Sequence, residues 1–490
     1  MASIDSGDDK MNPTLTLTDF ISIGPLLIVL MTALILILIE SFSENCSKKW
    51  SSLISIGGLT LSIFAVWGGI SPNHSSLLNP WIHFDSLARF FTVFFLVIGI
   101  GASLLATAFF QRFKASHGEY FFLLQSAVFG LILIGAAADL LTLFLGIETL
   151  SISLYVLCGY MKKWEISHES SFKYFLMGSI VAGFLLYGIA LVYGAIGTTR
   201  LDVLLSSYQT ISLTTEKVLF FSGIAMITLG LAFKAALVPF HTWSPDVYAG
   251  ASNPVTAFMA VGTKVGVFAA FVRLFFEALP QFDAAWNQVI DTLVYATLIY
   301  ANFVALKQIQ LRRFFAYSSI SHAGFLMIPV VIGNQEALSA LTFYLVIYAI
   351  ATFGCFAVLA YLDQNQEGVH FSDLHGLFSR SPWLASLLSI CLLTLAGIPP
   401  TAGFLAKFYV FKVAFQAGYY GLVIVGLLTT ILSSYYYLRI IGILFSESKS
   451  DEKLPYSMPA AIVGTTSFIA IIILSFYPAP FLKILSHLSN

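Results

Sequence analysis

The sequence predicts an all-α polytopic membrane protein, and its composition, its long apolar runs and the placement of its prolines indicate that class. Of the 490 residues, 58% are hydrophobic and 10% are charged, with a mean hydropathy of +0.87. Because soluble domains carry about a quarter charged residues, this chain has too few to cover a water-facing surface. The net charge of −1 offers no basic surface for a polyanion. A water-soluble enzyme, a disordered protein and a nucleic-acid-binding protein are therefore excluded.

Fourteen apolar runs are long enough to cross a bilayer, whose hydrocarbon core takes about 20 residues of helix. The acidic N-terminus, with Asp5, Asp8 and Asp9, differs from the basic start of a signal peptide, so we expect the first run to be a retained helix. The predicted spans are 20–39, 51–70, 86–110, 119–137, 140–160, 172–195, 217–237, 254–277, 287–305, 312–332, 337–361, 383–411, 419–445 and 458–478.

Two of these helices are predicted to be broken. The seventh span runs into Pro239 and then Pro245, and the twelfth contains Pro399 and Pro400 within GIPPTAG. Proline removes a backbone donor, and in lipid such a break survives only where protein or a watery cavity satisfies the freed carbonyls.

The breaks suggest an internal repeat. Five spans over 119–277 and five over 287–445 each place the broken helix fourth, which predicts two inverted five-helix repeats of the kind that ion and proton transporters use. Residues 1–118 then form an N-terminal tail with three spans, and 446–490 an interior loop with the last span. Twelve lysines and arginines in loops on one side, against seven on the other, predict that both termini lie outside.

Four ionisable residues lie where the bilayer makes charge expensive, about 2.5–3.5 kcal/mol at the centre. Glu148 is in the middle of the fifth span, Lys234 precedes the break of the seventh, Lys264 is near the centre of the eighth, and Lys407 follows the break of the twelfth. Lys173 lies nearer the interior end of the sixth span, from which it could snorkel to the interface. Snorkelling or static ion pairing is the structural alternative for all of them, but it does not suit Lys264.

These residue types together predict a switchable proton relay. Removal from water disfavours the charged form of a lysine and a neighbouring carboxylate restores it, so separating the two releases a proton. Lys234 is also expected at the C-terminal end of a helical half, where the macrodipole favours a cation.

Two histidines are further candidates, one for the proton relay and one for the break of the seventh span. His322, inside the tenth span among serines, is either a proton carrier between lysines or a histidine simply hydrogen-bonded to those serines. His241, after the seventh-span break and close to Trp243 and Asp246, is expected to cap or gate that break.

Other chemistry is not expected in this chain. His370 and His375 flank Asp373 in an interior loop, but no further residue completes a metal site. The sequence contains no nucleotide-binding motif and no cluster for an iron–sulfur centre or haem. The scattered cysteines are expected to be packing residues: Cys46, Cys158, Cys355 and Cys391.

These motifs resemble the antiporter-like, proton-pumping membrane subunits of respiratory complex I and the related multi-subunit cation/proton antiporters. The resemblance covers nearly the whole chain and is strongest over 119–445. It rests on GIETLSISLYVL, the stretch from Lys234 through VPFHTWSPDVYAGASNPVTA to Lys264, AYSSISHAGF, DLHGLFSRSP and LAGIPPTAGFLAKF. It implies an essential glutamate at Glu148, its lysine partner at Lys234, a central lysine at Lys264, the histidine between the repeats at His322 and the terminal relay residue at Lys407.

Within that family the chain is most similar to the N-type branch. The M-type carries glutamate where Lys407 stands, and the L-type has a long lateral C-terminal helix, whereas this chain ends at Asn490, soon after the last span. The stretch ESSFKYFLMGS with Lys173 also looks like the N-type pattern.

The resemblance implies a subunit of a proton-translocating NADH:quinone oxidoreductase, a translocase of the bacterial inner membrane. Protons would pass from Lys234 through Lys264 and His322 to Lys407, with the Glu148–Lys234 pair gating each cycle. NADH, FMN, iron–sulfur clusters and quinone would belong to partner subunits, and the neighbours would be the M-type and small membrane subunits. The alternative is a subunit of a Na⁺/H⁺ antiporter, which the same lysines would serve.

Overall fold

The computed structural model describes residues 17–42, 47–67, 77–113, 118–280, 284–363, 368–447 and 454–488. In these ranges the regular elements are helices, accompanied by three isolated β-bridges. The predicted all-α class is thereby confirmed. The acidic N-terminus, with Asp5, Asp8 and Asp9, and Cys46 lie outside the described residues, as does 448–453 of the predicted interior loop.

Thirteen helices among the described residues are long and apolar enough to cross a membrane. The broken pair α17 (Pro382–Ala396) and α18 (Ala402–Gln416) accounts for the remaining predicted span. The thirteen are α2 (Gly24–Phe42), α3 (Ser47–Trp67), α4 (Ser86–Phe113), α5 (Gly118–Gly135), α6 (Leu140–Cys158), α7 (Glu165–Ile196), α9 (Thr214–Lys234), the run from α11 to η3 (Asn253–Ala278), α13 (Ala284–Ala305), α14 (Leu311–Ile332), α15 (Gln335–Leu362), α19 (Tyr420–Leu444) and α20 (Met458–Phe476).

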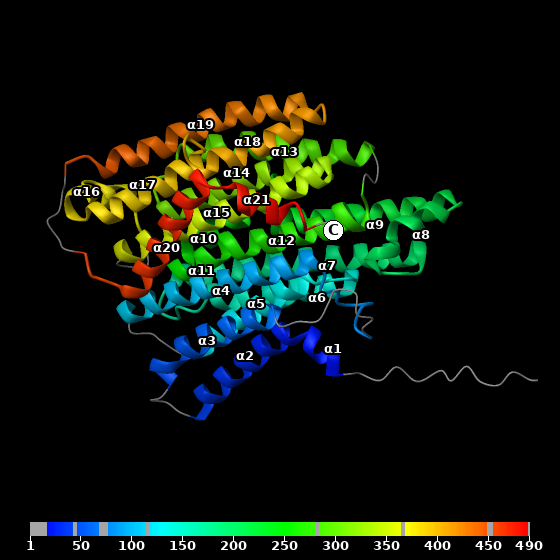
Figure 1. The fold of residues 1–490 in the computed structure, drawn as a ribbon, viewed down its shortest axis with the longest axis horizontal. Coiled ribbons are helices and arrows are strands. Elements are labelled where there is room, and N and C mark those ends of the chain that lie inside the picture. Colours follow the sequence, from blue (N-terminus) through cyan, green and yellow to red (C-terminus); the bar gives the residue numbers. More distant parts are fainter. Residues whose placement is uncertain are drawn as a thin grey trace, which may run out of the picture.

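These helices lie side by side as one bundle, with α2 and α3 at one edge and α19 at the opposite edge (Figure 1). The run Asn253–Ala278 is completely buried over its most apolar window, and α14 is buried over 89% of its window, compared with 28% for α20. Since α14 carries His322 and the run carries Lys264, both predicted relay residues belong to the inner helices of the bundle.

Both predicted breaks are present. α9 ends at Lys234, the chain turns through Ala236 at a φ of 56° and a cis Val238–Pro239 bond, and α10 (Trp243–Gly250) then begins. α17 ends at a left-handed Gly397, followed by a cis Pro399–Pro400 bond and α18. In each five-helix set the third helix packs against both halves of the broken one, α7 against α9 and α10 and α15 against α17 and α18.

The structure differs from the predicted spans in several short elements. α7 begins at Glu165 rather than 172, because a helix can continue through polar residues beyond its apolar stretch. The run Asn253–Ala278 is divided into α11 (Asn253–Phe258), a π-helical turn η2 (Met259–Thr263), α12 (Lys264–Val272) and a second π-helical turn η3 (Arg273–Ala278). Further short helices are α1 (Leu17–Ser22), η1 (Leu201–Val203), α8 (Leu204–Thr210), η4 (Phe371–Leu374), α16 (Leu377–Arg380) and α21 (Ala479–Leu485).

Candidate functional site

Glu148 and Lys234 face each other across the contact between α6 and α9. Asp139 caps α6 by accepting a hydrogen bond from the Leu141 backbone N–H at 2.7 Å, which fixes the start of the helix that carries Glu148. The Lys234 Nζ lies 3.9 Å from the Glu148 Oε1, and these side chains are 5% and 19% exposed. The carboxylate therefore acts on a buried ammonium by charge, without a short hydrogen bond.

Two hydroxyl groups of α6 complete the environment of Lys234. Its Nζ donates to the Ser151 Oγ at 2.7 Å and to the Tyr155 OH at 3.2 Å. Sequence reasoning missed both residues. Ser151 and Tyr155 lie three and seven positions after Glu148, a spacing that puts all three on one helix face, and that spacing was the signal that could have identified them.

Lys264 binds the end of a broken helix. This side chain is 2% exposed, and its Nζ donates to the backbone carbonyl of Ala235, the residue that caps α9. The last carbonyls of a helix lack partners within it and form the negative end of its dipole. Among the described residues no carboxylate forms an ion pair with Lys264, so a helix end takes the place of a counterion.

Lys407 repeats this arrangement in the second half of the chain. Its Nζ donates at 2.9 Å to the carbonyl of Ala396, the last residue of α17, and lies 4.7 Å from the centroid of the Phe325 ring. The side chain is 4% exposed, and within the ranges described above it too has no carboxylate partner. Each broken helix thus presents the C-terminus of its first half to a buried lysine.

His322 is held between two tyrosines rather than by its serine neighbours. Its Nδ1 lies 2.8 Å from the Tyr344 OH on α15, and its Nε2 lies 3.3 Å from the Tyr437 OH on α19. The Tyr437 OH is in turn 2.5 Å from the Ser318 Oγ. A neutral imidazole donates from one nitrogen and accepts at the other, so the two tyrosines have opposite roles that exchange with the tautomer. Sequence reasoning missed both tyrosines, because they belong to other helices.

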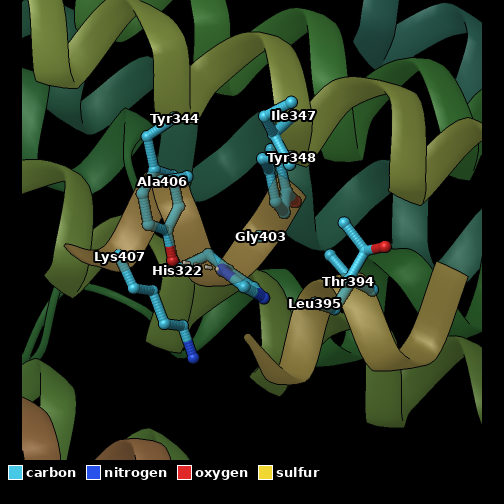
Figure 2. Close-up of a pocket in the computed structure, with 9 residues that line it drawn as sticks. All are labelled: His322, Tyr344, Ile347, Tyr348, Thr394, Leu395, Gly403, Ala406 and Lys407. Carbon is cyan, nitrogen blue, oxygen red and sulfur yellow. Dashed lines mark hydrogen bonds between the residues drawn. The ribbon is translucent and has the colours of Figure 1, made fainter. Parts of the chain in front are cut away.

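A small cavity brings His322 and Lys407 together. Figure 2 shows the Tyr344 hydroxyl pointing toward His322, with the Lys407 side chain beside them, among the residues that line this cavity. Tyr348 lines it as well and donates from its hydroxyl to the carbonyl of Ala260 at 3.0 Å. Because Ala260 lies in η2, four residues before Lys264, Tyr348 connects the cavity to the helix of that lysine.

Lys173 is not part of this buried group. Its side chain is 38% exposed and forms ion pairs with Glu169 at 2.6 Å and with Asp246 at 3.3 Å. The structure therefore places it in a charged cluster at one end of the bundle.

The first break is stabilised by polar and aromatic contacts. His241 is 6% exposed and packs edge-on against Tyr300 with the ring centroids 4.7 Å apart. The Val238 N–H donates to the Thr297 Oγ1 at 3.0 Å, and the Trp243 Nε1 donates to the Phe233 carbonyl at 2.9 Å. Asp246 forms its ion pairs with Lys173 and Arg313 instead of His241.

His370 and His375 lie in the loop between α15 and α16, and their hydrogen bonds stabilise it. The Asp373 carboxylate accepts from the His370 backbone N–H at 2.8 Å and so caps η4, while the His375 Nδ1 lies 2.8 Å from the Ser446 Oγ. In the part of the chain that the structure describes, no group of three or more His, Cys, Asp or Glu side chains could hold a metal ion. Cys158, Cys355 and Cys391 are free and buried.

Comparison with known proteins identifies the family. The family of NADH:quinone oxidoreductase/Mrp antiporter transmembrane proteins matches residues 137–433, a stretch that contains Glu148, Lys234, Lys264, His322 and Lys407. NADH-quinone oxidoreductase subunit N of Protochlamydia amoebophila is 99% identical over 480 residues, which cover 98% of this chain and 100% of that protein. Subunit N of Chloroflexus aggregans is 38% identical over 454 residues, covering 90% of this chain and 91% of that protein.

A solved structure agrees. A chain of respiratory complex I from Thermus thermophilus with bound aureothin matches with a TM-score of 0.78 and 29% identity, over 94% of this chain and 99% of that one. Fold and buried site together define an antiporter-like membrane subunit. The chain belongs to the NADH:quinone oxidoreductase/Mrp antiporter family, and within it to the proton-pumping N-type subunits of NADH-quinone oxidoreductase, as the sequence predicts.

Proposed function

We propose that protons cross this subunit through Lys234, Lys264, His322 and Lys407, and that the Glu148–Lys234 pair gates each cycle. One observation carries the proposal. The three lysines are at most 5% exposed, yet among the described residues a carboxylate pairs only with Lys234, and the other two lysines rest against helix ends. A partial charge stabilises an ammonium without locking it into an ion pair, so the proton can still leave.

The geometry of the Glu148–Lys234 pair supports a gating role. At 3.9 Å the two groups interact strongly in a poorly polarisable interior, and the interaction falls as they separate. Any movement of α6 against α9 therefore changes whether Lys234 retains its proton.

Water is the expected carrier between the relay residues. Two buried oxygens on the helices of the Glu148–Lys234 pair have no hydrogen-bond partner among the described residues: the Glu148 Oε1 on α6 and the Thr228 Oγ1 on α9. Buried polar atoms are normally satisfied by protein or by ordered water, so these positions are where water would complete the chain.

The proposal extends to the setting of the subunit. We infer a bacterial inner membrane location with both termini on the periplasmic side, from the excess of lysine and arginine in the loops on the opposite side. The M-type and small membrane subunits are the proposed neighbours, and NADH, FMN, iron–sulfur clusters and quinone are assigned to other subunits. The equivalent packing of α7 and α15 supports two inverted repeats over 119–277 and 287–445.

Replacement of the buried lysines in the assembled complex tests the relay. We expect Lys264→Ala and Lys407→Ala each to lower NADH-driven proton uptake by membrane vesicles to about a tenth or less, since a positioned proton-transfer group typically contributes about a hundredfold. Lys412→Ala is the matched control, because Lys412 lies on the same helix as Lys407 but is 46% exposed. Unchanged proton uptake by either buried variant, in a complex that assembles normally on a native gel, would refute the relay.

A further inference from the structure

The short helix α10 is bound by two consecutive arginines of α14, one at its C-terminal end and one along its side. Arg312 donates from its guanidinium to the carbonyl of Ala251, the residue that caps α10. Arg313 pairs with the carboxylate of Asp246 in the middle of α10. A cation at a helix C-terminus complements the dipole, so α14 binds both the end and the side of α10.

The helix α7, which belongs to the same five-helix set as α10, binds the Asp246 carboxylate as well. The Lys173 Nζ lies 3.3 Å from the Asp246 Oδ2, and the Ser170 Oγ donates to the Asp246 backbone carbonyl at 3.1 Å. The two helices also approach closely, since a Cβ on Gly250 would lie 1.8 Å from the Ser170 Oγ. In the part of the chain that the structure describes, Asp246 is therefore the carboxylate that joins Lys173 of the first set to Arg313 of the second.

The opposite end of α10 lies next to the relay. Trp243, its first residue, donates to the carbonyl of Phe233, which directly precedes Lys234. Its ring stacks on Tyr174 of α7 with the centroids 4.7 Å apart. A helix of eight residues is about 12 Å long and stiff, so a displacement at Asp246 reaches the end of α9, where Lys234 is the last residue and Lys264 binds the Ala235 carbonyl.

The helix α14 leads from Arg313 to the second half of the relay. His322 lies nine residues after Arg313 on the same helix, or about 13 Å along its axis. The Arg313–Asp246 ion pair thus links α10, the helix that follows Lys234 after the break, to α14, the helix that carries His322.

We propose that Asp246 is a positioning residue that keeps α10 of the first five-helix set in register against α14 of the second and thereby aligns the two halves of the relay. The inference rests on the proposed relay. The side chains of Lys173, Asp246 and Arg313 are 38%, 37% and 46% exposed, and ion pairs of such exposure are individually weak. Loss of the carboxylate therefore shifts the position of α10 and leaves the fold intact.

Asp246→Asn in the assembled complex tests the proposal. We expect the ratio of protons moved to NADH oxidised to fall about fivefold, while the amount of assembled complex stays at the wild-type level; this is the change that about 1 kcal/mol produces in an equilibrium. A merely structural residue would lower assembly, and both rates together, and would leave the ratio unchanged. Asp246→Glu should restore most of the ratio, since it retains the charge.

Two further variants separate the loss of this ion pair from the loss of any exposed ion pair. Asp202→Asn removes the carboxylate of another exposed ion pair, with Arg200, and should leave the ratio unchanged. Arg313→Gln should lower the ratio as Asp246→Asn does, and the double variant should be no worse than either single one. Should Asp246→Asn fail to assemble, Arg313→Gln alone gives the test, because it removes the same ion pair and leaves Asp246 paired with Lys173.

Failure of this proposal differs from failure of the relay. If Lys264→Ala stops pumping while Asp246→Asn assembles and keeps the wild-type ratio, the positioning role is wrong and the relay stands. Independent, additive effects of Asp246→Asn and Arg313→Gln would overturn it as well. Normal pumping by Lys264→Ala would remove the relay, and with it the basis of this inference.

Discussion

Lys264 and Lys407 show how an amine can be stable inside the membrane and still be available for chemistry. A buried ion pair needs several good hydrogen bonds to offset desolvation, and removing one partner leaves a costly charge. Here the partner is a backbone carbonyl, of Ala235 for Lys264 and of Ala396 for Lys407. A carbonyl carries no full charge and does not titrate, so the lysine can lose its proton without leaving an uncompensated anion behind.

Lys234 differs because side chains surround it, and Ser151 is the closest of them. We predict that Ser151→Ala lowers NADH-driven proton uptake by roughly tenfold, because a hydrogen bond to a charged group is worth about 1.5–3 kcal/mol and its acceptor at 2.7 Å is lost. Vesicle proton uptake and native-gel assembly would be measured together.

Ser153→Ala is the matched control. Ser153 is a buried serine of the same helix whose Oγ, like that of Ser151, donates to a backbone carbonyl one turn earlier, but Lys234 donates to Ser151 and not to Ser153. A loss of uptake as large in Ser153→Ala as in Ser151→Ala would show that the hydrogen bond to Lys234 is not the cause.

The broken helices are the elements that create the site, and small residues make the second break possible. Gly403 lies where α18 begins, and its α-carbon approaches α17 closely: a Cβ there would lie 1.7 Å from the Thr394 backbone carbonyl oxygen. Backbone atoms cannot move aside as a flexible side chain can. The two halves therefore depend on glycine for their spacing, and Lys407 reaches Ala396 across that gap.

We predict that Gly403→Ala separates α18 from α17 and reduces proton uptake by at least about tenfold, because overpacking costs about 1–3 kcal/mol and moves the backbone. Gly442→Ala is the control, since a Cβ there would meet nothing within 4 Å. Normal uptake by Gly403→Ala in a fully assembled complex would show that the spacing of the two halves is not critical.

At the scale of the whole molecule, the spans and both breaks follow from the sequence because their signals are local. Run length predicts a helix that crosses lipid, and Pro239 and Pro400 mark the places where it must stop. The π-helical turn before Lys264 has no such signal, because the residues of a π turn do not differ from those of an α-helix. Sequence reasoning also identified Lys234, Lys264, His322 and Lys407, since charge inside a span is conspicuous, but it counted Arg273 and Arg312 with the loops although both are buried at helix ends.

The partners of those residues depend on tertiary packing instead. Tyr344 and Tyr437 lie 22 and 115 positions from His322 in the sequence. Their hydroxyls reach the imidazole only because α15 and α19 pack beside α14. A single sequence gives no measure of such distances, so the tyrosines, and the joining of two helix sets by Asp246, appear only in the structure.

A second charged cluster forms around Arg273, in the last turn of the buried run Asn253–Ala278. Arg273 in η3 is 3% exposed and donates to both carboxylate oxygens of Asp85, at 2.6 and 2.8 Å, and to the carbonyl of Gly135. It also pairs with Glu277 at 2.6 Å. Because Asp85 precedes α4 and Gly135 ends α5, one guanidinium holds three helices together.

The acid dependence of that cluster gives a prediction for the stability of the subunit. Burial raises the pKa of the Asp85 carboxyl, but the charge and hydrogen bonds of Arg273, together with the Ala88 N–H, outweigh burial and lower its pKa below the ordinary 3.8. A carboxyl with a lowered pKa in the folded state contributes stability above its unfolded pKa and loses it as pH falls through the folded value. The contribution is therefore complete at neutral pH, begins to fall near the unfolded value of about 4, and is lost as the pH falls further through the lowered folded value.

Asp85→Asn should accordingly destabilise the subunit at pH 7 by about 2 kcal/mol, less than the 3–5 kcal/mol of a fully buried pair because Asp85 is 23% exposed and Glu277 still faces Arg273. The midpoint temperature at which this subunit leaves the purified complex should fall at pH 7, and the difference from the wild type should shrink as the pH falls below about 4. Glu336→Gln, which removes an exposed pair with Lys412, should leave the midpoint nearly unchanged. An equal midpoint for Asp85→Asn and Glu336→Gln at pH 7 would mean that the Arg273 cluster does not hold these helices together.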